Sequence, residues 1–482
     1  MWVFIEIEVQ NKTGTEAFGL YFALFNLSMV LNMILDAGMV NFNNKKIAAK
    51  PHLASKYLNR LVPIRFILAG IYFLILLVAG FILQYSAHAV FILCTLGLNQ
   101  VLLATLMFIR SNLQGMHFFK SDSIVSIADR VVMAALILYV FYAVSSDQFQ
   151  IEWFVYIQTA GYLVSVLLAL IFLFFHGGIK FKPRFNFKFS VLYLKRCFPY
   201  ALIGVLMLFY SFIDSVILER IKGEAEAGIY AQSSRLLLAL INFSYLFSIP
   251  LLPMFSRMIA KKEPFTELLR LSGSILILTT IFVSFTFAIY AEEIITALYA
   301  KKDSLGLIQK LILSYNGQLN NIENADEIAK SIDVFRICIL TFIPMSSLYV
   351  YGTFLTAAGE MKVLNISAAL AVLLNVCCNL LLIPYYGVEG AAVVSLITQT
   401  FVCTFQIYYM RKRFKLKLEK SLILRYISSL LTLGLTLWFF QQIDFPWISE
   451  CISSVAISLL VAVLIKAIPI PSISKLLKFK EN

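Results

Sequence analysis

The stretch VPIRFILAGIYFLILLVAGFIL, residues 62–83, carries a single charged side chain, Arg65. A helix of about 20 apolar residues spans the hydrocarbon core of a bilayer, so this stretch predicts a transmembrane helix. The rest of the chain repeats the pattern. The expected spans are residues 18–40, 62–83, 89–108, 124–144, 153–175, 199–218, 228–253, 271–290, 334–357, 363–383, 390–410, 422–440 and 448–468.

The composition indicates an all-α polytopic membrane protein. Hydrophobic residues make up 60% of the chain and charged residues 14%, with a mean hydropathy of +0.84. These values lie far outside the range of a soluble domain. The net charge of +13 would suggest nucleic-acid binding in a soluble protein. In a membrane protein the positive charge orients the chain and interacts with anionic lipid headgroups. No nucleic-acid partner is therefore expected.

Lys and Arg occur in every second loop between the expected spans. The basic segments are residues 45–60, 110–120, 180–196, 257–270, 362, 411–420 and 475–480. Because positively charged loops remain cytoplasmic, this alternation predicts a cytoplasmic C-terminus. The intervening loops are neutral or acidic, and residues 291–333 are expected to form one long external loop with more acid than base.

Two short motifs recur in the two halves of the chain. Gly19-Leu20-Tyr21 opens an early span and Gly228-Ile229-Tyr230 opens a later one, while Phe4-Ile5-Glu6 and Phe212-Ile213-Asp214 precede them in nearly the same register. This pattern predicts an internal repeat. On that register, residues 1–9 would be the outer end of a truncated first helix. A chance match of two three-residue motifs is the alternative.

The spans and the repeat predict two six-helix lobes, the first with its first helix truncated, and a C-terminal helical hairpin. The expected boundaries are an N-terminal transmembrane lobe at 1–176, a basic cytoplasmic linker at 177–198, a C-terminal transmembrane lobe at 199–411, and an extra two-helix hairpin with a cytoplasmic tail at 412–482. Two lobes plus extra helices is a transporter layout.

Several motifs along the chain resemble those of a known transporter family. They are Gly19-Leu20-Tyr21, Leu35-Asp36-Ala37-Gly38, Ile213-Asp214, Gly228-Ile229-Tyr230-Ala231, Gly352 with Ala357-Ala358-Gly359, and the run from Asn375 through Asn379-Leu380-Leu381-Leu382-Ile383-Pro384 into Tyr386-Gly387-Val388-Glu389-Gly390-Ala391-Ala392. On these residues the chain resembles the polysaccharide (O-antigen) flippase branch of the multidrug/oligosaccharidyl-lipid/polysaccharide exporter superfamily. The resemblance covers essentially the whole chain, although each motif alone is weak.

The resemblance implies a transporter that carries out no chemical reaction. Its substrate would be a polyprenyl-pyrophosphate-linked oligosaccharide, moved from the inner to the outer leaflet of the bacterial cytoplasmic membrane for O-antigen and lipopolysaccharide biosynthesis. Membrane lipids and the polysaccharide polymerase machinery are the other expected partners. The truncated first helix departs from the family, in which that helix helps form the gate for the lipid tail, and this puts the activity in doubt.

Ionisable side chains inside the spans indicate where a substrate would bind. Each costs about 2.5 to 3.5 kcal/mol at the membrane centre on insertion scales and therefore faces a cavity or a partner. Asp214 and Arg235 are expected at similar depths on consecutive spans. They would either form a structural ion pair between helices, or Arg235 would contact the anionic substrate while Asp214 tunes its release.

Polar side chains at helical spacing predict either a wet cavity or interhelical hydrogen bonds. They include Asn242 on the face of Arg235, Asn375 and Asn379, and Gln399. A second charged layer near the cytoplasmic ends of the first-lobe spans comprises Asp36, Arg65, Arg110, Asp129 and Arg130. It would bind pyrophosphate on uptake, or its arginines would extend to the interface. Arg336 near the outer end of its span is the candidate exit contact.

No motif for a metal, nucleotide or cofactor is present in the sequence, so none is expected. Alternating access would carry the lipid-linked head outward, with Na⁺ or H⁺ coupling through Asp36 or Asp214 as an open question. Pro344, Pro250 and Pro253 predict kinks. Two other classes stay open: a multidrug or cation exporter of the same superfamily, and a membrane oligosaccharide polymerase, for which residues 291–333 offer a poor active site without His or Arg.

Overall fold

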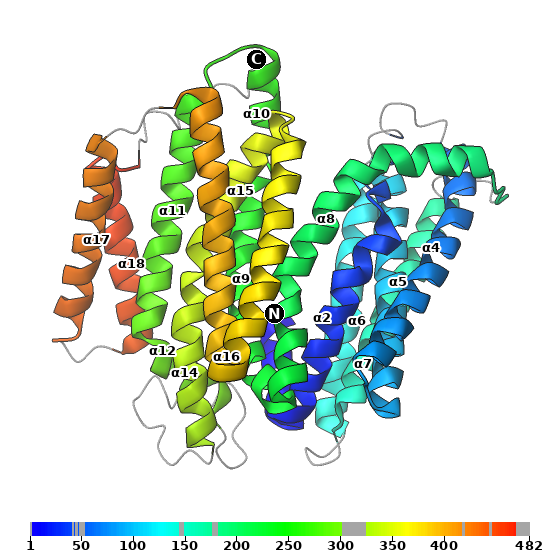
Figure 1. The fold of residues 1–482 in the computed structure, drawn as a ribbon, viewed down its shortest axis with the longest axis horizontal. Coiled ribbons are helices and arrows are strands. Elements are labelled where there is room, and N and C mark those ends of the chain that lie inside the picture. The colour runs from blue at the N-terminus through cyan, green and yellow to red at the C-terminus, as the bar shows by residue number, and fades with distance from the viewer. Residues whose placement is uncertain are drawn as a thin grey trace. The chain divides into compact units, whose positions relative to one another are not determined.

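The computed structural model describes residues 2–40, 43, 47, 54–143, 149–175, 182–300, 324–416, 420–442 and 446–468. Within this described part all regular elements are helices (Figure 1). The chain divides into two compact units, Met1–Gly228 and Ile229–Asn482. The predicted all-α membrane fold is therefore confirmed, and each unit is described by itself.

Unit 1 is a bundle in which α2 and α7 lie at the centre. Its helices are α1 (Trp2–Thr13), α2 (Thr15–Asp36), α4 (Ala54–Ile82), α5 (Ala87–Gly115), α6 (Phe119–Ala143), α7 (Ile151–Phe175) and α8 (Phe187–Lys222). Helix α2 packs against α8, α5 and α4, while α7 packs against α5 and α6. The first residues of α9 (Glu224–Ser248), up to Gly228, belong to the same unit.

Local sequence signals set several helix ends in unit 1. The Ser86 side chain accepts a hydrogen bond from the backbone N–H of Ala89 at 3.2 Å and caps α5. The Asn186 side chain caps α8 by accepting a bond from the Phe189 N–H at 2.9 Å. Both residues satisfy backbone donors that the first helical turn leaves unpaired. Helix α8 ends at Gly223, whose φ of 95° suits glycine.

Unit 2 is built around α11, α15 and the long α16. Besides the rest of α9 it contains α10 (Leu251–Ala260), α11 (Thr266–Ile289), α12 (Ala291–Tyr299), α14 (Ala325–Leu340), α15 (Phe342–Ala357), α16 (Met361–Phe414), α17 (Lys420–Phe440) and α18 (Trp447–Leu464). Helix α15 packs on α16 and α11, and α17 pairs with α18, which lies against α11. The predicted terminal hairpin is thus present.

Proline and glycine break the long apolar helices where the sequence predicts kinks. Helix α9 ends at Ser248 and α10 begins after Pro250, while α14 ends at Leu340 and α15 begins just before Pro344. Each proline lacks the backbone donor that a continuous helix would use. Helix α16 bends at Gly387, where φ is 57° and ψ is −131°, and so contains two predicted spans.

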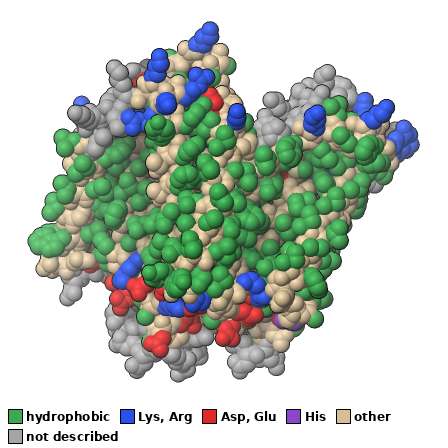
Figure 2. Space-filling model, in the orientation of Figure 1, with side chains coloured by type: hydrophobic (Ala, Val, Ile, Leu, Met, Phe, Trp, Pro, Cys, Tyr) green, Lys and Arg blue, Asp and Glu red, His purple; other side chains and the backbone are tan. Residues whose placement is uncertain are grey.

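The helices are long and apolar enough to cross a membrane. Eleven of them meet that description over the described residues, with Leu424–Phe440 as a shorter apolar helix. Counting α16 as two spans and adding Leu424–Phe440 reproduces the thirteen predicted ones. On the visible face of each unit, hydrophobic side chains form a broad belt, with Lys and Arg gathered at the upper end and Asp and Glu mixed with some Lys and Arg at the lower end (Figure 2).

The structure changes the description of two segments that the sequence predicts as a loop and a linker. The segment 291–333 is not a simple loop, because α12 and the start of α14 lie within it; residues 301–323 lie outside the described residues. Helix α8 begins at Phe187, so part of the segment 177–198 is helical and continuous with a span. The assignment of residues to functional lobes stays a prediction.

Candidate functional site

Asp36 and Arg65 from the predicted cytoplasmic charged layer lie together in unit 1. Arg65 Nη1 is 3.8 Å from Asp36 Oδ1. Asp36 is the last residue of α2, where its carboxylate also accepts a hydrogen bond from the Val40 N–H at 3.1 Å. The Arg65 guanidinium lies 4.8 Å from the centre of the Phe108 ring. This arrangement places one cation between helices, on an aromatic face.

Arg110, in the same charged layer, is held by a carboxylate that the sequence analysis did not single out. Its Nε donates to Asp122 Oδ1 at 2.7 Å, and its Nη2 donates to Oδ2 at 3.4 Å. Gln114 donates to the same carboxylate at 2.9 Å. Asp122 lies in the first turn of α6, a favoured place for an acid. Arg110 therefore ties α5 to α6.

Arg130 is more open to its surroundings than Arg110. Its Nε lies 3.4 Å from the carboxylate of the preceding residue, Asp129, and its side chain is 59% exposed. The Asp129 side chain is buried beneath it. Of the predicted layer, the Arg65 and Arg110 side chains are thus largely buried, at 10% and 18% exposed, and that of Arg130 is exposed.

Polar side chains of α2 bond to neighbouring helices of unit 1. Asn32 donates to the side chain of Gln100 on α5, and Gln100 donates to Ser28 Oγ at 3.3 Å. Asn26 donates to Ser215 on α8 at 2.7 Å. These are interhelical hydrogen bonds of the kind that stabilise membrane bundles. Gln100 and Ser215 were not among the residues predicted from the sequence, because their partners lie on other helices.

In unit 2, Arg235 is a buried cation on a polar face of α9. It is only 8% exposed. One turn earlier, Gln232 donates to Glu327 Oε1 on α14 at 3.0 Å, and the Tyr299 hydroxyl donates to the Gln232 carbonyl at 3.3 Å. Asn242 is exposed and donates to the Leu238 carbonyl of its own helix at 2.9 Å. The structure therefore gives Arg235 and Asn242 different surroundings.

Asp214 is buried in the C-terminal half of α8. It belongs to unit 1, whereas Arg235 belongs to unit 2. Their pairing stays a prediction. Arg336 on α14 lies 3.2 Å from the carboxylate of Asp333, one turn before it, and its side chain is 47% exposed. An exposed pair of this kind contributes little to stability and leaves the cation open to a ligand.

The two arms of α16 share a fully buried amide cluster. Asn379 donates to Asn375 Oδ1 at 3.0 Å, and Asn375 donates to Thr398 Oγ1 at 3.4 Å across the bend at Gly387. Gln399 is buried beside Thr398. The predicted polar groups Asn375 and Asn379 are thus brought together. Thr398 completes the cluster, and the sequence analysis did not single it out.

One buried acid near the C-terminal end of α8 was not among the residues predicted from the sequence. Glu219 on α8 accepts a hydrogen bond from the Tyr85 hydroxyl at 2.9 Å and pairs with Arg220, which stacks 4.0 Å from the Tyr85 ring. Burial and the Glu219 carboxylate raise the pKa of the Tyr85 phenol. The adjacent charges of Glu219 and Arg220 could have been noticed in the sequence. Nothing in the sequence indicates that Tyr85, between α4 and α5, is their partner.

Comparison with known proteins assigns the chain to a protein family. It matches the family described as polysaccharide biosynthesis protein over residues 9–259, more than half of its length. It is 24% identical over 416 residues to "Uncharacterized membrane protein MJ1375" of Methanocaldococcus jannaschii, covering 81% of this chain and 88% of that protein.

Solved structures show the same fold. The lipid II flippase MurJ, in an inward closed conformation, superposes with a TM-score of 0.71 at 13% identity, over 98% of this chain and 96% of that one. An inward-facing multidrug resistance MATE family transporter of the MOP superfamily gives a TM-score of 0.64 at 13% identity, over 85% and 94%. The chain therefore belongs to the polysaccharide biosynthesis protein family, as its motifs predict, and has the fold of the MurJ and MATE transporters.

Proposed function

We propose that this chain is a flippase that moves a polyprenyl-pyrophosphate-linked oligosaccharide from the inner to the outer leaflet for cell-surface polysaccharide biosynthesis. The observation that carries the proposal is the match to the polysaccharide biosynthesis protein family over residues 9–259. The fold shared with a lipid II flippase supports the same class of substrate. Transport of this kind makes and breaks no bond.

Cationic side chains in membrane helices suit an anionic head group. Arg235 is buried on α9, and Arg65 is buried on α4. A charged side chain at such a position is costly in lipid and is retained where it meets a partner or a ligand. In this proposal Arg235 binds the pyrophosphate, and the exposed Arg336 meets it during release.

The membrane potential can drive the loaded step. Moving a negative charge outward runs with an inside-negative potential and gains about 2.3 kcal/mol per charge per 100 mV. The two predicted lobes would rock to expose the head group outside while the lipid tail stays in the bilayer. Na⁺ or H⁺ coupling through Asp36 or Asp214, and docking of a polymerase on the outer side, are further parts of the proposal. The proposal also places the protein in the cytoplasmic membrane, with its C-terminus on the cytoplasmic side.

Cells that lack the gene provide the test. We expect them to accumulate lipid-linked glycan on the inner face, where an external glycosidase cannot reach it, and expression of the wild-type chain should restore access. Accumulation on the outer face would instead indicate a polymerase and would contradict the flippase.

A multidrug exporter is the second candidate, favoured by the structural likeness to a multidrug resistance MATE family transporter. A cation exporter needs acidic groups in its cavity, whereas the buried Arg235 and Arg65 repel cations. Normal glycan distribution together with increased sensitivity to cationic drugs in cells lacking the gene would favour this candidate over the flippase.

A further inference from the structure

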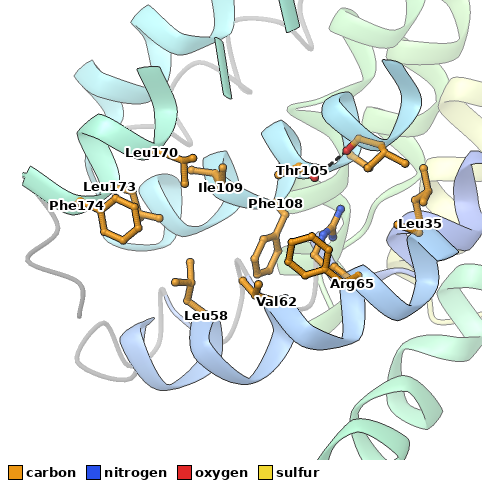
Figure 3. A pocket seen from close by; sticks show the side chains of 14 residues that line it. Leu35, Leu58, Val62, Arg65, Thr105, Phe108, Ile109, Leu170, Leu173 and Phe174 are labelled. Carbon is orange, nitrogen blue, oxygen red and sulfur yellow. Dashed lines mark hydrogen bonds between the residues drawn. The ribbon is translucent and has the colours of Figure 1, made fainter. Parts of the chain in front are cut away.

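Unit 1 encloses an apolar cavity next to Arg65 (Figure 3). Its volume is about 230 Å³. The lining side chains come from α2, α4, α5 and α7, and all except Arg65 and Thr105 are apolar. The Thr105 hydroxyl donates to the Val101 carbonyl of its own helix at 2.8 Å. The guanidinium of Arg65 is therefore the polar group that the cavity offers to a ligand.

The size and lining of the cavity suit a hydrocarbon chain. An apolar protein cavity of roughly 150 Å³ stays dry and binds small hydrocarbons such as benzene. This cavity is larger, and Leu58, Val62, Phe108 and Leu173 contribute to its wall. Water would find few hydrogen-bond partners along such a wall, so an apolar chain is the occupant that the lining favours.

Arg65 has hydrogen-bonding capacity that the described residues leave unused. Its side chain is 10% exposed, and its Nη1 atom is buried without a hydrogen-bond acceptor. The nearest carboxylate oxygen, Asp36 Oδ1, lies 3.8 Å away, beyond hydrogen-bonding distance. A guanidinium presents N–H donors in a fork that matches the oxygens of a phosphate. An anionic oxygen in the cavity would lie against this guanidinium, which the Asp36 carboxylate does not hydrogen-bond.

The cavity borders the lipid-facing surface of unit 1. Phe66 on α4 and Phe174 on α7 line it, and both side chains are exposed, Phe66 to 75%. Phe174 lies at the end of α7, next to the basic segment 180–196, and Phe66 lies about three turns into α4, after the basic segment 45–60. A lipid chain can therefore enter sideways from the bilayer while its head group stays near the interface.

We infer that this cavity binds one hydrocarbon chain of a membrane lipid and that Arg65 binds the phosphate of the same lipid. The inference extends the proposed function, because a lipid-linked glycan is one such amphiphile. It concerns a site inside unit 1 and needs no transport. Polyprenyl phosphates and ordinary phospholipids share the required chemistry.

Thermal unfolding of the purified full chain in a nonionic detergent tests the site. The probes are farnesyl phosphate and dodecyl phosphate, with farnesol and dodecanol as uncharged counterparts. We expect the phosphates to raise the Tm at about tenfold lower concentration than the alcohols, as a charged hydrogen bond predicts. Arg65→Gln should remove that advantage, whereas Arg184→Gln, at an exposed arginine of unit 1 outside the cavity, should keep it.

A second pair of variants tests the chain-binding part. Ala69→Phe places a ring in the cavity and should weaken all four probes about tenfold, as expected when several CH₂ groups lose their site. Gly70→Phe adds the same ring at the next position, where a Cβ meets nothing within 4 Å, and should bind normally. If Ala69→Phe does not fold, Ala104→Leu fills the cavity from α5 with a smaller group.

The two phosphates separate the possible lipids. Tighter binding of farnesyl phosphate indicates an isoprenoid lipid, and equal binding indicates phosphate lipids in general; both support the site. Stabilisation that is unchanged by Arg65→Gln, or by a folded cavity-filling variant, would overturn it. Because the readout is binding in detergent, its failure would leave the flippase proposal standing, and a failed transport assay would leave this site standing.

Discussion

Gly19 on α2 and Gly228 at the start of α9 meet in backbone contact. A Cβ added at Gly19 would lie 2.6 Å from the Gly228 nitrogen and 1.9 Å from the Glu224 carbonyl oxygen. Small residues allow membrane helices to approach this closely. The two glycines open the recurring motifs Gly19-Leu20-Tyr21 and Gly228-Ile229-Tyr230, so equivalent positions of the expected repeat lie in a single contact.

Substituting Gly19 with alanine should separate these helices. The added methyl has no room, and overpacking of this kind costs about 1–3 kcal/mol of unfolding free energy. Thermal unfolding in detergent would measure the loss. Gly70→Ala is the matched control, since its Cβ meets nothing within 4 Å and alanine favours the helix. Equal stability of the two variants would show that the contact does not exist.

Arg110 and Asp122 should behave as one unit in a double-mutant cycle. Arg110→Gln removes two bonds to a largely buried carboxylate and should cost about 1–3 kcal/mol. Adding Asp122→Asn should recover part of that loss, because no unpaired charge remains. The exposed Arg130→Gln should cost less than about 0.5 kcal/mol. Strictly additive single losses would contradict the pair.

Glu293 on α12 should make stability depend on pH. Burial raises the pKa of its carboxyl, the neighbouring carboxylates of Glu292 and Glu450 raise it further, and its own backbone N–H and Arg336 oppose the rise. One carboxyl oxygen of Glu293 is buried without a hydrogen-bond partner among the described residues. Ionisation is therefore disfavoured in the folded state.

The sign of this dependence follows from proton binding. The folded state holds the Glu293 proton more tightly than the unfolded state, so stability falls as pH rises from near 4.5, the ordinary value, through the raised pKa. Melting curves at pH 5 and pH 8 should differ more for the wild type than for Glu293→Gln. An identical difference in both proteins would mean that Glu293 does not titrate in this way.

The spans were predictable because hydropathy reports the length and polarity of a helix directly. The helix breaks at Pro344 and Pro250 were also predictable from local sequence, because proline lacks the backbone N–H that a continuous helix uses. Helix α12 was missed because its nine residues are too few for a span, and it lies in a polar segment. Local signals therefore sufficed for the membrane helices.

The partners of the charged and polar groups were not predictable in the same way. The sequence predicts Arg65 and Asp36 in one charged layer, but nothing in it says that Arg65 also faces Phe108 and lines a cavity. The bonds from Arg110 to Asp122 and from Asn375 to Thr398 depend on how helices rotate about their axes. A single sequence specifies the apolar length of a helix more strongly than that rotation.

Transbilayer movement in reconstituted vesicles tests the central claim most directly. The purified chain would be placed in liposomes with a polyprenyl-pyrophosphate-linked oligosaccharide, and the fraction accessible to an external glycosidase would be followed over time. We predict rapid movement with the wild type, at least about tenfold slower movement with Arg235→Gln as one charged hydrogen bond to the substrate is lost, and partial recovery with Arg235→Lys. Movement no faster than in protein-free liposomes would contradict the flippase.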